Sequence, residues 1–112
     1  MPSGDIAIVF DCGATNVRVI AIDSKGDILA SESYNNNTRP DPFYPSYRIW
    51  DATEIWNNMC TACRKVLSKI DKDNICGITV TTFGVDGALF DKKGAMLYPV
   101  ISWQCERTNP IM

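Results

Sequence analysis

The sequence predicts an α/β fold in which an antiparallel meander is followed by a helix and by a parallel strand of the same sheet. Apolar runs at 6–10, 17–22 and 28–30 are typical of strands and are separated by short polar segments. Apolar residues recur at helical spacing between 51 and 70, and a β-branched stretch follows at 75–83. Because a strand that returns after a helix pairs in parallel, the sheet should be mixed.

The first strands have the composition of a well-covered sheet. Residues 6–10 are all apolar, and 17–22 is interrupted only by Arg18. Asp23–Asp27 is expected to form the turn into 28–30, with Gly26 in the left-handed conformation. A second Asp-x-Lys-Gly turn at 91–94 should join two further short strands as a hairpin.

Asp51 is expected to begin the helix as its N-cap, with Glu54 completing a capping-box pattern. The helical spacing predicts one buried stripe, made of Ala52, Trp56, Met59, Cys60, Cys63, Val66, Leu67 and Ile70. Before this helix, residues 35–47 carry three Asn and three Pro among aromatic residues, which favours a surface loop.

Composition limits the classes of function. The 112 residues suit one domain, 46% of them are hydrophobic, and the net charge of −2 comes from 11 basic and 13 acidic residues. We therefore expect no nucleic-acid partner. No stretch has the length or composition of a secretory signal or a membrane span, so we expect a cytoplasmic protein with no membrane partner. With no histidine in the chain, acid–base chemistry would fall to Asp or Glu.

The five cysteines are an odd number and lie in different predicted elements, which favours reduced thiols. Cys60 and Cys63 have C-x-x-C spacing, but they fall within the predicted helix. Without a second such pair or a histidine to complete a zinc site, we expect them to be core thiols.

The segment Asp11–Asn16, Asp-Cys-Gly-Ala-Thr-Asn, combines the parts needed to bind a metal-bound polyphosphate. Gly13 permits positive φ and a close approach of a ligand to the backbone, and successive turn N–H groups can bind an anion. Thr15 and Asn16 can donate further hydrogen bonds, and Asp11 can hold Mg²⁺ through water. A P-loop is absent from the sequence. The alternative is an ordinary hairpin with a polar turn.

Two later segments have the composition of a polyol site. Gly84-Val85-Asp86-Gly87 follows a predicted strand, at the sheet edge where ligands gather, and the same edge should carry Asp11. The segment 102–108 sets Trp103 beside hydrogen-bond donors. The two polar turns are expected to face one cleft. The alternatives are a bulge at 84–87 and a core or cap role for Trp103.

Together, segments 10–18, 81–88 and 102–108 resemble the opening of FGGY-type carbohydrate kinases. Members of that family have two actin-like (ribonuclease H-like) domains around a cleft. The resemblance implies that residues 1–112 are the first part of the N-terminal domain, which is incomplete here, and that the second domain is absent. It also implies phosphoryl transfer from Mg-ATP to the C1 hydroxyl of L-fuculose, with L-rhamnulose and D-xylulose as alternative sugars.

The resemblance also implies a role for individual residues. The ATP phosphates and Mg²⁺ would be met by Asp11, Cys12, Gly13, Ala14, Thr15, Asn16 and Arg18. The metal would be held by Asp11 through water. The sugar would be met by Gly84, Asp86, Trp103 and Arg107. The family's catalytic base has no counterpart in these residues, so the chain alone should be inactive. Homo-oligomerisation is left open.

Two other classes of protein share part of this pattern. A retroviral-type aspartic protease also places Asp-(Thr or Ser)-Gly-Ala after an apolar strand. However, Cys12 replaces its hydroxyl residue, and the predicted helix at 51–70 does not suit its mostly β fold. A non-catalytic actin-like module that binds nucleotide would leave the sugar-side segments unexplained.

Overall fold

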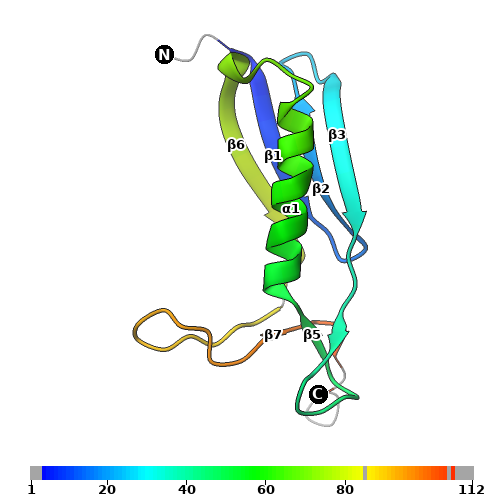
Figure 1. Cartoon of the computed structure of the whole chain (residues 1–112), viewed down its shortest axis with the longest axis vertical. Helices are drawn as coiled ribbons and strands as arrows, with labels where there is room; N and C mark the ends of the chain where they lie inside the picture. The colour runs from blue at the N-terminus through cyan, green and yellow to red at the C-terminus, as the bar shows by residue number, and fades with distance from the viewer. Residues whose placement is uncertain (1–3, 85, 106, 108–112) are drawn as a thin grey trace.

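The main sheet has the mixed topology expected from the sequence. The computed structural model describes residues 4–84, 86–105 and 107. In the order β3-β2-β1-β6, the pairs β1/β2 and β2/β3 are antiparallel and the pair β1/β6 is parallel. The strands are β1 (Ile6–Cys12), β2 (Asn16–Ile22), β3 (Ile28–Asn35) and β6 (Ile75–Thr82). The meander and the parallel crossover are therefore confirmed (Figure 1).

Helix α1 (Ala52–Leu67) lies across one face of this sheet (Figure 1). Asp51 is its N-cap as expected, since its side chain accepts a hydrogen bond from the Glu54 N–H. The second half of the capping box is not formed, because the Glu54 carboxylate pairs with Arg39, 2.5 Å away. One N–H group at the start of the helix, that of Glu54, is therefore capped, and an ion pair connects the helix to the preceding loop.

The buried stripe of α1 differs from the predicted one. Met59 and Val66 are buried against the sheet as predicted, and so is Ala62, which the predicted stripe did not include, whereas Trp56, predicted to be core, is 66% exposed. Cys60 and Cys63 are half-buried free thiols, and Ala52 is exposed. The reason is that α1 packs mainly on β2 and β3 and leaves β6 uncovered, with Ile78 68% exposed. The expectation of a well-covered sheet therefore holds for the face of β1 and β2 under the helix only.

Below the main sheet, as drawn in Figure 1, a small second sheet has the order β4-β5-β7. Its strands are β4 (Arg39–Pro40), β5 (Arg48–Trp50) and β7 (Val100–Ile101). A 3₁₀ turn, η1 (Lys72–Asn74), leads into β6. Among the described residues, no helix is long and apolar enough to cross a membrane.

Both predicted Asp-x-Lys-Gly turns are formed. Gly26 and Gly94 have φ values of 86° and 84°, as left-handed turn positions require. Asp23 and Asp91 each accept two main-chain N–H bonds within their own turn. The second turn closes a hairpin through the bridge between Phe90 and Met96.

Candidate functional site

The predicted phosphate turn, residues 13–15, joins β1 to β2 as a tight hairpin. The Gly13 N–H donates to the Asn16 carbonyl oxygen at 2.9 Å. A Cβ at Gly13 would stand 2.8 Å from that same oxygen, so no larger residue fits without moving the backbone. Gly13 is not among the glycines with positive φ, and its role is therefore close approach rather than the left-handed conformation that the sequence also allowed.

Asn36, which was expected only to be part of a surface loop, holds this turn by hydrogen bonds from the end of β3. It is 4% exposed, its main-chain N–H donates to the Thr15 oxygen at 2.8 Å, and its side-chain Nδ2 donates to the Gly13 oxygen at 3.0 Å. The signal in the sequence was a polar residue directly after β3, the strand paired with β2. The carbonyl oxygens of Gly13 and Thr15, at the two ends of the turn, therefore both accept hydrogen bonds from the buried Asn36.

The turn keeps donors for a ligand. Within the described part of the chain, the N–H groups of Ala14 and Thr15 donate to no other main-chain group. They border an open cavity of about 410 Å³. The cavity is lined by Asp11, Gly13, Ala14, Thr15, Asn16, Arg18 and Ser33. Free turn amides, hydroxyls and a guanidinium form a donor set that suits an anion.

The charged side chains at this cavity are one acidic and one basic residue, which form an ion pair. Arg18 lies 3.3 Å from the Asp11 carboxylate, and both side chains are partly exposed. An ion pair in such a position is weak, so both groups remain able to meet a ligand. No group of three or more metal-ligating side chains occurs among the described residues. A single carboxylate matches a magnesium ion that keeps most of its waters.

Cys12 is buried beneath the turn. Burial raises the pKa of its thiol, and the nearby charges of Asp11 and Asp86 raise this pKa further, against a hydrogen bond with Thr82. The thiol is therefore neutral at physiological pH, and its contribution to the turn is packing.

The predicted sugar-side segment begins at the same edge of the sheet as the predicted phosphate turn. Cys12 pairs with Thr82 in the parallel ladder, and the Phe83 N–H donates to the Cys12 oxygen at 3.3 Å. The cavity at the turn is lined by Ser33 of β3, however, and not by Gly84 or Asp86. The single cleft expected for both turns therefore stays a prediction.

The predicted sugar-side residues are arranged in two groups. Gly84 is exposed, and a Cβ there would meet nothing within 4 Å. Trp103 is 49% exposed, and its main-chain N–H donates to Asp86. Arg107 lies in a different cluster, which joins the loop between β4 and β5 to the segment after β7. Val85 and Glu106 lie outside the described residues.

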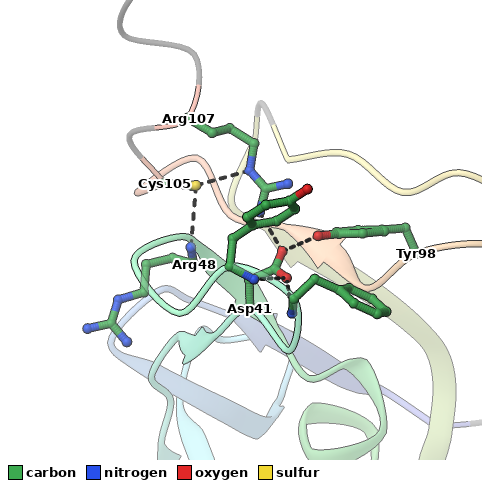
Figure 2. Close-up of polar contacts among 7 residues, drawn as sticks. Asp41, Arg48, Tyr98, Cys105 and Arg107 are labelled. Carbon is green, nitrogen blue, oxygen red and sulfur yellow. Dashed lines mark hydrogen bonds and ion pairs between the residues drawn. The ribbon is translucent and has the colours of Figure 1, made fainter.

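In that cluster Asp41 is a buried carboxylate with four hydrogen bonds (Figure 2). It accepts from the Phe43 and Tyr44 N–H groups, from the Tyr98 hydroxyl and from Arg107, the last at 2.9 Å. Burial acts to raise its pKa, but these donors outweigh it and lower the pKa to about 2. The loop at 38–47, which the sequence left without a role, is anchored here.

Arg107 is occupied by protein contacts on several sides. Besides Asp41, its guanidinium lies 4.6 Å from the centre of the Tyr47 ring, and its Nε donates to the Cys105 sulfur at 3.1 Å. Burial acts to raise the pKa of Cys105, but the hydrogen bonds from Arg107 and from the Arg48 N–H lower it overall. In the described residues, Arg107 thus ties its segment to the loop.

Comparison with known proteins gives a family and a fold. A family model described as the N-terminal domain of the FGGY family of carbohydrate kinases matches residues 6–112. The L-fuculokinase of Haemophilus influenzae is 51% identical over 112 residues, which cover 96% of this chain and 24% of that protein. The L-fuculokinase of Escherichia coli K12 is 44% identical over 108 residues, with 96% and 23% covered.

The chain therefore spans about a quarter of the length of the curated relatives it matches. Among solved structures, a ligand-bound xylulose kinase from Lactobacillus acidophilus superposes with a TM-score of 0.81 at 19% identity. The match covers 95% of this chain and 21% of that one. At this identity the likeness concerns the fold alone, and it confirms the actin-like fold class expected from the sequence.

Proposed function

Since this chain belongs to the FGGY family of carbohydrate kinases, we propose that it forms the first part of domain I of a kinase acting on L-fuculose. The reaction would transfer the γ-phosphate of ATP to the C1 hydroxyl of the sugar. The proposal for the sugar rests on the similarity to two L-fuculokinases over nearly the whole chain. L-Rhamnulose and D-xylulose are the competing substrates.

The observation that carries the proposal is the turn at 13–15. Its two free N–H groups border a cavity that also holds a guanidinium and a carboxylate. In the proposed complex the Ala14 and Thr15 amides donate to phosphate oxygens, with hydroxyl and amide donors from Thr15 and Asn16. Because the turn is held rigidly by Asn36, these donors are oriented before the ligand arrives, which is the main requirement for electrostatic catalysis of phosphoryl transfer.

Asp11 and Arg18 have separate roles in this proposal. Asp11 would hold a hydrated Mg²⁺ through water, and this ion would neutralise charge on the phosphates. Arg18 adds a positive charge at the cavity and lies 3.3 Å from the Asp11 carboxylate, with which it forms an ion pair. Asp11 is not assigned as a base, because a carboxylate that faces phosphates and a metal must stay deprotonated.

We assign the sugar side to Gly84, Asp86, Trp103 and Arg107. Gly84 leaves open space beside the end of β6, and Trp103 offers a half-exposed indole face on which a sugar can lie. Asp86 already accepts hydrogen bonds from protein N–H groups, and Arg107 already donates one to Asp41. Their proposed role is therefore to shape the sugar side of the site. The catalytic base and the adenosine site are expected outside these 112 residues.

The experiment is a panel of ketoses tested with the full-length protein that carries this chain. L-Fuculose should give the highest kcat/KM, and Asp11→Ala should abolish turnover. A higher kcat/KM for L-rhamnulose or D-xylulose would correct the substrate and leave the class intact. Absence of phosphorylation on every ketose would favour the non-catalytic nucleotide-binding module instead.

A second measurement tests the proposed division of labour between this chain and the rest of the protein. Residues 1–112 alone should show no sugar-dependent ATP consumption, since closure of two domains normally excludes water from such sites. Turnover above that of an Asp11→Ala control would refute this part of the proposal.

A further inference from the structure

Asp86 lies where three segments of the chain meet. Its Oδ1 accepts one hydrogen bond from the indole N–H of Trp50, at 2.8 Å, and another from the main-chain N–H of Trp103, at 2.7 Å. Trp50 belongs to β5 and is 1% exposed, and its ring stacks on Phe83 with centroids 4.7 Å apart. One oxygen thus joins the end of β6, the second sheet and the turn that carries Trp103.

The two tryptophans contact Asp86 in different ways. Trp50 is buried and supplies a fixed donor, so it can only hold Asp86 in place. Trp103 is bound through its backbone, which leaves its side chain half exposed. Asp86 therefore controls where the Trp103 backbone lies without covering its indole.

The carboxylate is poorly placed to serve as a sugar ligand. Its Oδ1 already receives two N–H donors. Its Oδ2 is buried and has no hydrogen-bond partner among the described residues. The cavity at the turn is not lined by Asp86 either. What the protein uses at this position is one acceptor atom, Oδ1, which an amide also possesses.

We infer that Asp86 is a positioning residue for the sugar side of the site, acting through its hydrogen bonds to Trp103 and Trp50 rather than by touching the sugar. The inference rests on the proposed function. It differs from the simplest view of Asp86, in which the negative charge itself binds a hydroxyl.

The experiment compares Asp86→Asn with Asp86→Ala in the full-length protein. Asparagine keeps an acceptor at Oδ1, and alanine removes it. We expect Asp86→Ala to raise the KM for the ketose at least about tenfold while the KM for MgATP stays within about twofold. We expect Asp86→Asn to stay within about threefold of the wild type for both substrates. Trp50→Phe, which removes the indole N–H donor but keeps an aromatic ring next to Phe83, should fall between the two.

A readout independent of activity is the hydrogen exchange of the Trp103 amide, measured by NMR on protein labelled at tryptophan. Asp86→Ala should speed this exchange at least about tenfold, and Asp86→Asn should leave it protected. The matched control is Asp91→Ala. Asp91 also accepts two main-chain N–H bonds, at 2.8 and 2.9 Å, but in the exposed hairpin turn. Its loss should change neither the ketose KM nor the Trp103 exchange.

The inference is overturned if Asp86→Asn loses as much ketose affinity as Asp86→Ala while Trp103 stays protected, because the charge would then act directly. It is also overturned if Asp86→Ala changes both KM values equally, or changes neither the ketose KM nor the Trp103 exchange. If no ketose is phosphorylated by the wild type but the exchange rates behave as expected, the proposed function fails and the positioning of Trp103 by Asp86 stands.

Discussion

Replacing Gly13 with alanine is the sharpest perturbation of the phosphate turn. The new methyl group would stand 2.8 Å from the Asn16 main-chain oxygen, against the 3.4 Å at which ordinary contact begins. The obstructing atom belongs to the backbone and is held by the hydrogen bond from Gly13, so the turn itself must shift. A shift that misaligns one donor to a charged phosphate costs about 1.5–3 kcal/mol, or roughly a ten- to hundredfold change in affinity.

The assay is steady-state kinetics of the full-length protein with L-fuculose and MgATP varied separately. Gly13→Ala should raise the KM for MgATP by that factor and leave the KM for the ketose within about twofold. The control is Gly77→Ala on β6, where an added Cβ meets nothing within 4 Å, and both KM values should be unchanged. A normal KM for MgATP in a folded Gly13→Ala variant would refute the assignment of this turn to phosphate.

Three further predictions concern the turn, the core and the cluster at Asp41. Asn36→Ala removes the side-chain bond to the turn and should raise the KM for MgATP about three- to tenfold; an equal rise in the ketose KM would contradict it. Val66→Ala removes part of a fully buried side chain of α1 that packs on the sheet, and it should lower the free energy of unfolding by about 2 kcal/mol in a denaturant titration. A change under about 0.5 kcal/mol would argue against that packing. Because the pKa of Asp41 is lowered from 3.8 to about 2, the stability it contributes is complete above pH 3.8 and is lost as pH falls through about 2. Melting temperatures between pH 5 and 2 should therefore fall more steeply for the wild type than for Asp41→Asn, and equal slopes would count against it.

The parts of the fold that were predictable from sequence are those specified by neighbours along the chain. Strand periodicity and the single crossover determine the order and direction of the main sheet. The left-handed glycines, Gly26 and Gly94, follow from turn chemistry that acts within four residues. The N-cap at Asp51 is equally local.

The parts that were missed depend on contacts across the fold. Helical spacing correctly marked Met59 and Val66, but it could not show that α1 would lie over β2 and β3, which leaves Trp56 exposed. Asn36 looked like one of three loop asparagines until the sheet placed it behind the turn.

The candidate site shows the same division. The candidate phosphate turn could be proposed from the sequence because its residues are consecutive. The partners of Asp86 and Arg107 were not, since Trp50 lies 36 positions from Asp86 and Asp41 lies 66 positions from Arg107. Only the folded chain brings these groups together, and only then does their role as internal ties become visible.

The most direct test of the proposed site is a crystal structure of the full-length protein with Mg²⁺, a non-hydrolysable ATP analogue and L-fuculose. We expect phosphate oxygens within hydrogen-bond distance of the Ala14 and Thr15 amides, and the sugar between Gly84 and the Trp103 ring with its C1 hydroxyl toward the γ-phosphate. Phosphates bound away from the turn, or a sugar held on the opposite face of the sheet, would contradict the proposed kinase site.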